Sequence, residues 1–313
     1  MDPEERELLA KSLAQVTARH TGASLDAALG DLGWADAHAA DPETSVSTLF
    51  ELQGSANATS SALDHVLAAA LGLGDGAMSV VLPPLGSTEP PGRVYGGSVT
   101  VAGLALSAVA DRDWTVVVGE RAAAVLARAT LGLRPVQGLD PGLGLVEVTA
   151  TTAWPDAQSS CVPWPEAVAA GQRALAHELV GASRAMLDLA RVHALERIQF
   201  GRPIAAFQAV RHRLAESLVA VEAADAALAA AWDDRSAFAA GVAKALAGRG
   251  ARTVARHSQQ VLAGIGFTTE HPLHRYVRRV HVLDRLLGDS RSLTRRLGDD
   301  LLARRSLPSI LPL

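Results

Sequence analysis

The sequence predicts a mainly helical α+β protein: N-terminal helices, a small middle β-barrel or sheet domain, and a C-terminal helical bundle. Helical periodicity is found at both ends of the chain. Val-rich runs separated by Gly and Pro occupy the middle. Apolar-periodic segments of about 20–30 residues follow, as in bundles of antiparallel helices. We expect the three parts to span residues 1–76, 77–156 and 160–313.

In the N-terminal part, the pattern predicts helices at 3–20 and 60–73. Asp2 is a candidate helix cap, followed by Pro3 at the first helical position and by acidic residues in the first turn. Residues 45–52 and 55–62 indicate helix or turn.

The middle part contains four Val-rich runs, at 78–82, 98–106, 114–118 and 144–150. Proline and glycine clusters separate them, which predicts a meander of short strands. The order of helices, strands and helices is not that of a Rossmann fold. No Gly-rich stretch has the strand–GxGxxG–helix context, and neither a Walker A motif nor a GxSxG elbow is present.

The C-terminal part should form a helical bundle, with Pro203 in the break between its first two helices. We expect helices at 164–194, 207–232, 236–263, 271–287 and 291–304.

Composition limits the possible functions. Of the 313 residues, 49% are hydrophobic and only 4% aromatic, so Ala, Leu and Val must pack a sizeable core. A net charge of −4 argues against a general nucleic-acid binder. The single cysteine, Cys161, excludes an intramolecular disulfide and a thiolate zinc cluster. The acidic N-terminus and the lack of a long apolar segment predict a cytoplasmic protein without a membrane span.

Charge is distributed unevenly along the chain. Residues 1–110 hold 4 basic and 13 acidic residues, a balance of −9, and residues 251–313 hold 11 and 5, a balance of +6. The two ends could neutralise each other across a contact, or the C-terminal part could present a basic surface to phosphorylated small molecules.

Two segments of the C-terminal part carry the most information. The first reads RIQFGRPI at 197–204 and continues with FQA at 207–209, and the second reads QQVLAGIGFTTEHPLHR at 259–275. Together they resemble the RxQFGxPI…FQA and QxxGGxGfTxExPxxR elements of the acyl-CoA dehydrogenase family, in order and at the right separation. The resemblance implies an FAD-dependent enzyme that oxidises the Cα–Cβ bond of an acyl-CoA thioester.

In that family the matched residues hold the FAD of a neighbouring subunit. By resemblance, Arg197 pairs with the pyrophosphate and Phe200 packs on the cofactor. Gln208 and Gln260 bond toward the adenosine half, and Gly264, with Gly266, lets the backbone approach it closely. Each residue also has a plain structural alternative: a surface pair for the arginine, core for the phenylalanine, helix caps for the glutamines and a turn for the glycines.

The usual catalytic base of the family is missing. Its position falls on Leu287, and the alternative position on the first bundle helix falls near Gly171. Neither side chain accepts a proton. Glu166 and Glu178 lie on the same predicted helix at other spacings and are open candidates. Glu270 matches a glutamate of the family, but not the catalytic one.

These departures favour the short, base-less subunit of a heterotetrameric, α2β2 acyl-CoA dehydrogenase. The loop and strand that hold the flavin ring in the same subunit also have no convincing counterpart here. Family analogy points to a homologous catalytic partner and a steroid-derived acyl-CoA substrate. Two alternatives stay open: a self-sufficient homo-oligomer with a displaced base, and an assembly or regulatory subunit without flavin.

The histidines of the second segment suggest no metal site. His271 and His274 share a face of the predicted helix, and His281 lies close to that face. No ligand of another type lies beside them, and several arginines on the same helix would repel a cation.

Overall fold

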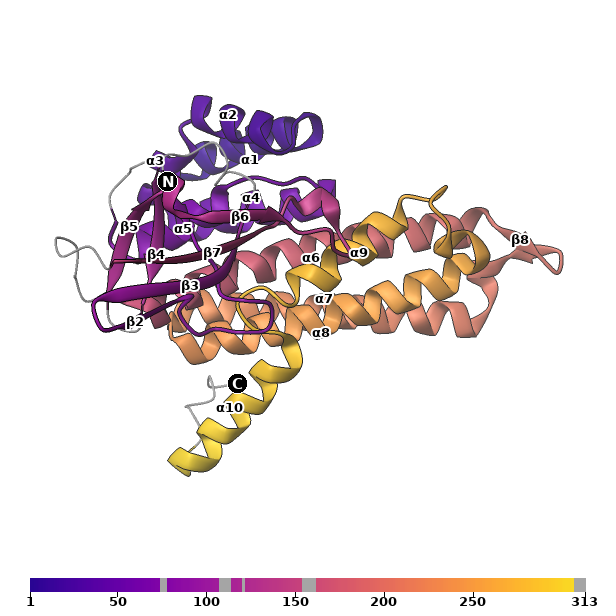
Figure 1. Cartoon of the computed structure of the whole chain (residues 1–313). Coiled ribbons are helices and arrows are strands. Elements are labelled where there is room, and N and C mark those ends of the chain that lie inside the picture. The colour runs from indigo at the N-terminus through magenta and orange to yellow at the C-terminus, as the bar shows by residue number, and fades with distance from the viewer. Residues whose placement is uncertain (74–77, 107–113, 120–121, 154–161, 307–313) are drawn as a thin grey trace.

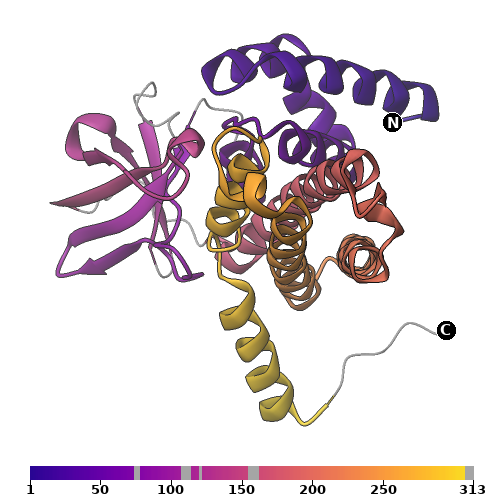
Figure 2. The same cartoon turned by 90° about the vertical axis from the view of Figure 1, so that its right-hand side faces the viewer.

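The structure is a computed structural model and describes residues 1–73, 78–106, 114–119, 122–153 and 162–306. Helices, two small sheets and a long helical bundle follow one another along the chain, as the sequence predicts. In Figures 1 and 2 the sheets lie beside one end of the helical body, and α10 extends away from it. Cys161 lies outside the described residues.

The N-terminal part contains more helices than expected. They are α1 (Pro3–Arg19), α2 (Ala23–Asp31), α3 (Trp34–Ala40), α4 (Pro42–Ala56) and α5 (Ala62–Ala70). Asp2 accepts a hydrogen bond from the backbone of Glu5, whose side chain bonds back, so the predicted start of α1 is confirmed. The sequence analysis missed α2 and α3, which are short and begin after Gly22 and Gly33, both at positive φ.

The strands of the middle part form two sheets and not a simple meander. One contains β1 (Ser79–Val80), β4 (Trp114–Val118) and β5 (Ala123–Ala127), and its β1 and β4 are parallel. The other has the order β2 (Gly92–Tyr95), β3 (Ser98–Ala105), β7 (Val146–Ala153) and β6 (Gly132–Pro135). The meander prediction was wrong because β3 pairs with the distant β7 over its whole length. A small apolar cluster packs Val81, Val101, Leu126 and Val148 together.

The bundle consists of α6 (Trp164–Glu196), α7 (Gln208–Asp234), α8 (Ala237–Leu262), α9 (Leu273–Leu283) and α10 (Ser290–Arg304). A two-stranded hairpin of β8 (Ile198–Gln199) and β9 (Arg202–Pro203) joins α6 to α7. The helix predicted to reach residue 287 ends at Leu283. It ends there because the ammonium group of Lys244 donates hydrogen bonds to the carbonyl oxygens of Leu283 and Asp284. Within the described ranges, no helix combines the length and apolar character needed to cross a bilayer.

Two glycines allow α4 and α6 to pack with their backbones in close contact. A Cβ on Gly54 would overlap the carbonyl oxygen of Glu178, and a Cβ on Gly181 would overlap that of Glu51. The Ser55 hydroxyl donates to the carbonyl oxygen of Gly181 at 3.1 Å. This contact fixes the N-terminal helices on the first helix of the bundle.

The guanidinium group of Arg279, on α9, joins all three parts of the chain. Its side chain is 1% exposed. It donates at 2.5 Å to Asp140 from the β region and at 2.8 Å to the carbonyl oxygen of Ala58 from the N-terminal helices. It also lies 3.6 Å from the carboxylate of Glu178 on α6.

Burial raises the pKa of Glu178 to about 7, although Arg279 and a 3.1 Å hydrogen bond from Gln53 act in the opposite direction. The Gln53 carbonyl oxygen in turn accepts from Ser60 at 2.6 Å, so the amide is held in place. The Glu178 carboxyl group is therefore a buried group of this network, with one oxygen that accepts no hydrogen bond.

Replacing Gly181 by alanine should destabilise the protein by about 2 kcal/mol or more, because the new methyl group has no room between α4 and α6. Gly30→Ala is the matched control, since a Cβ at Gly30 meets nothing within 4 Å. That change should alter stability by less than about 1 kcal/mol, in the stabilising direction. Urea unfolding of both variants checks this, and equal midpoints would contradict the close-packed contact.

The raised pKa of Glu178 makes stability depend on pH. The folded carboxyl holds its proton to higher pH than the unfolded one, so its contribution is complete below the unfolded pKa and is lost as pH rises through about 7. The loss should be roughly 3 kcal/mol at most. Glu178→Gln should flatten the fall in unfolding free energy between pH 5 and 8, and Glu147→Gln, at an exposed pair, should not.

Candidate functional site

The hairpin between α6 and α7 presents Phe200 to solvent. Phe200 and Gly201 form its tip with φ angles of 53° and 79°. Such a two-residue turn favours Asn or Gly in the first position, so phenylalanine there is strained. The ring is 91% exposed, which rules out the core alternative for this residue.

The two sequence motifs meet beside this hairpin. The ring of Phe200 lies edge-on to that of Phe207, with centroids 6.1 Å apart. The guanidinium carbon of Arg202 lies 4.4 Å from the centroid of the same Phe207 ring. A hollow of about 360 Å³ opens here, and Phe200 of the first motif and Gln260 of the second both line it.

Arg197 and Gln208 flank the hairpin. The carbonyl oxygen of Arg197 accepts from the backbone N–H of Ile204 at 2.8 Å, which closes the loop. Its side chain is exposed, and no ion pair between described residues involves it. Gln208 is the first residue of α7 and is exposed; no side chain caps that helix, so a capping role for Gln208 is wrong.

The two glycines of the second motif differ in their surroundings. Both lie in the 3₁₀ turn Ala263–Phe267 that follows α8. A Cβ on Gly264 would meet nothing within 4 Å, whereas Gly266 packs on Leu262 and Gln259. Gly264 therefore leaves its surface open to an approaching group, and Gly266 serves the turn itself.

This surface fits FAD in chemical type. An exposed guanidinium suits a pyrophosphate, amides suit the hydrogen-bonding edge of an adenosine, and an exposed aromatic ring suits stacking. Arg197, Phe200, Gln208, Gln260 and Gly264 are all solvent-exposed. In Figure 1 the hairpin lies at the end of the bundle far from the sheets.

Leu287 and Gly171, the two residues at which the sequence resemblance would place the base, lie against each other. Leu287 is 1% exposed, and a Cβ on Gly171 would overlap its Cδ1 atom and lie 3.0 Å from Leu67. The side-chain amide of Gln172 donates to the carbonyl oxygen of Leu287 at 2.9 Å. An apolar contact between these two residues therefore fills this part of the interior.

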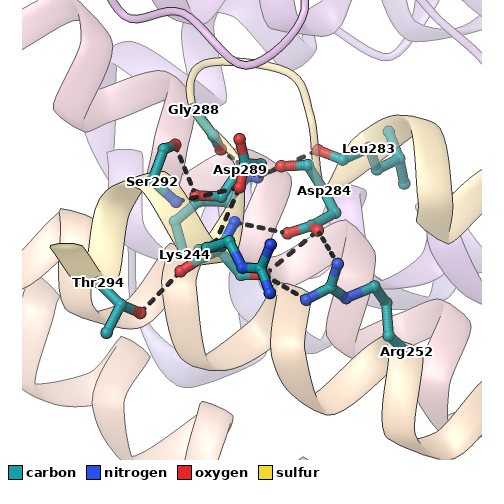
Figure 3. Close-up of polar contacts among 10 residues, drawn as sticks. Lys244, Arg252, Leu283, Asp284, Gly288, Asp289, Ser292 and Thr294 are labelled. Carbon is teal, nitrogen blue, oxygen red and sulfur yellow. Dashed lines mark hydrogen bonds and ion pairs between the residues drawn. The ribbon is translucent and has the colours of Figure 1, made fainter.

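Lys244 holds the turn that contains Leu287. Its ammonium group is completely buried and donates to the carbonyl oxygens of Leu283, Asp284 and Gly288 at 3.1, 2.9 and 3.3 Å (Figure 3). Burial lowers the pKa of Lys244 to about 8, although Asp284 and Asp289 raise it. The role of Lys244 was not predicted from the sequence. The one indication there is that it is a lone lysine within an Ala-rich helix.

The remaining carboxylates lie elsewhere. Glu166 is exposed in the first turn of α6, and Glu270 is exposed in the loop before α9. Glu178 is buried against Gln53 and Arg279. Among the histidines, the His274 ring nitrogen contacts the carbonyl oxygen of His271 at 2.8 Å. The described part of the chain contains no group of three or more His, Cys, Asp or Glu side chains arranged for a metal ion.

Comparisons with known proteins agree with these motifs. The model of the acyl-CoA dehydrogenase C-terminal domain matches residues 167–302. Acyl-CoA dehydrogenase IpdE2 of Mycobacterium tuberculosis is 30% identical over 330 residues, which cover 96% of this chain and 98% of that protein.

Two solved structures share the fold. The ChsE4–ChsE5 complex of Mycobacterium tuberculosis matches with a TM-score of 0.77 and 20% identity, over 99% of each chain. The Tcur3481–Tcur3483 steroid ACAD matches with a TM-score of 0.77 and 22% identity, over 96% of this chain and 98% of that one. With the near full-length match to IpdE2, these findings show that the chain belongs to the acyl-CoA dehydrogenase family.

Proposed function

We propose that this chain is the base-less subunit of an FAD-dependent acyl-CoA dehydrogenase and works with a homologous catalytic subunit as α2β2. It completes the FAD site of that partner through Arg197, Phe200, Gln208, Gln260 and Gly264. The flavin supplies the hydride acceptor for α,β-desaturation of a CoA thioester. This chain binds and orients the cofactor, and the partner supplies the base.

The observation that carries the proposal is the contact between Leu287 and Gly171. Removing the α-proton of a thioester requires a base within hydrogen-bond reach of that proton. Both family positions for this base are apolar here and touch each other. Neither a leucine nor a glycine side chain accepts a proton, so this chain supplies no base at either position.

The exposure of the cofactor surface supports action in trans. Phe200 is strained and almost fully exposed, a combination that persists where a partner or ligand later covers the ring. The exposed Arg197 guanidinium can form paired, charge-assisted bonds with pyrophosphate oxygens. The exposure of both residues supports the same conclusion, that the FAD they hold lies outside this chain.

A steroid-derived acyl group is the substrate class that we propose. The similar Tcur3481–Tcur3483 protein, a steroid ACAD, supports this substrate class. The ChsE4–ChsE5 complex supports the arrangement of two different subunits. A bulky ring system needs a wide acyl site. A subunit that has no reacting centre of its own can leave the space for such a site free.

A second candidate is a self-sufficient enzyme in which Glu178 is the base. One observation favours it: burial raises the pKa of Glu178 to about 7, near the value that suits a base at neutral pH. Its contacts with Gln53 and Arg279 favour a structural role instead.

Arg197→Ala should lower the FAD content of the purified two-subunit complex at least about tenfold at limiting FAD, because a charge-assisted pair to the pyrophosphate is lost. Arg191→Ala is the matched control, since Arg191 is exposed in the last part of α6, shortly before Arg197, and pairs with Asp188. Flavin absorbance relative to total protein measures the effect. Unchanged FAD retention in the Arg197 variant would favour the flavin-free alternative.

Glu178→Gln separates the first two candidates. If the partner supplies the base, the variant complex should keep its turnover within about twofold of the unsubstituted complex at pH 8. If Glu178 is the base, turnover should fall by a factor of about 100 or more. Reduction of the flavin by an acyl-CoA in stopped-flow spectroscopy distinguishes these outcomes, with circular dichroism as the check on folding.

A further inference from the structure

Arg173 on α6 is a buried cation without a counter-ion. Its side chain is 9% exposed, and its Nε and Nη1 atoms have no hydrogen-bond partner. No ion pair between described residues includes it. The other deeply buried arginine, Arg279, has two carboxylates and a carbonyl oxygen around it. A buried charge left unpaired is costly, so Arg173 requires an explanation.

Trp232, near the end of α7, positions two guanidinium groups. The guanidinium carbon of Arg173 lies 4.8 Å from the centroid of the Trp232 ring. The Nε atom of Arg235 donates to the carbonyl oxygen of Trp232 at 3.4 Å. The indole N–H donates to His177 at 3.0 Å, which holds the ring in place.

The acidic residues of this turn leave the two arginines without a carboxylate. Asp233 and Asp234 are exposed, and Asp234 accepts the hydroxyl of Ser236 at 2.7 Å. Burial lowers the pKa of Arg173, and Arg235 lowers it further. Both guanidinium groups contact Trp232, Arg173 over its ring and Arg235 at its carbonyl oxygen. Two like charges that share this neighbour favour an anion between them.

We propose that Arg173 and Arg235 form a binding site for a small oxyanion at the turn between α7 and α8. A phosphate or carboxylate group matches the donor geometry of a guanidinium edge. The ligand must be small, since nine-tenths of the Arg173 side chain is already covered by protein. This site is separate from the surface around Arg197 and does not depend on FAD.

Inorganic phosphate is the probe that tests the site. The thermal unfolding midpoint of the chain should rise with phosphate and saturate, relative to chloride at equal ionic strength. Arg173→Met should abolish this rise, and Arg235→Met should weaken phosphate binding at least about tenfold. Arg249→Met, at an exposed arginine on α8, and Arg197→Ala should both retain it.

The variants also separate anion binding from a structural role. In chloride alone, Arg173→Met should be at least as stable as the unsubstituted chain, because it removes an unpaired buried charge. Arg173→Lys keeps the charge but not the fork, so phosphate should bind it more weakly. A phosphate response that survives Arg173→Met, that disappears in Arg197→Ala, or that is absent from the unsubstituted chain would overturn the proposal.

Discussion

The buried guanidinium group of Arg279 is the interaction on which the arrangement of this protein depends. A charge removed from water must be met by groups that come to it. Here they come from three parts of the chain: Ala58 after α4, Asp140 before β7 and Glu178 on α6. The close backbone contact at Gly54 and Gly181 fixes α4 against α6 beside it. These contacts hold the sheets, the N-terminal helices and the bundle in one arrangement.

The position of α9 then determines the position of the turn that contains Leu287. Because Arg279 fixes that helix, the turn beyond it lies above Lys244, which takes three of its carbonyl groups. Leu287 adopts positive φ in this turn and packs on Gly171. The interior at this turn is therefore apolar. The opposite end of the bundle, by contrast, leaves its arginine, aromatic ring and amides uncovered.

The sequence predicted the elements whose signals are local. The long helices of the bundle and the start of α1 at Asp2 follow from periodicity and capping, and both were confirmed. The exposure of Phe200 was not predictable from composition, since an isolated phenylalanine is usually buried. Its motif was the better guide to its position on the surface.

Apart from the short helices α2 and α3, the features that were not predicted depend on partners that are distant in the sequence. The parallel pairing of β1 with β4 joins segments with no local turn between them. The end of α9 is set by Lys244, which lies on another helix. The network around Arg279 draws on residues more than 100 positions apart, and no local pattern marks it. Side-chain contacts of this kind follow only from the packed structure.

The number of FAD molecules per subunit pair tests the central claim most directly. The chain should be purified alone and then with a homologous acyl-CoA dehydrogenase subunit from the same organism, with flavin absorbance and protein measured in each. The account predicts a colourless isolated chain, and a complex that gains flavin and is bleached by its acyl-CoA. One FAD per chain in the isolated protein, reduced by an acyl-CoA without a partner, would contradict it.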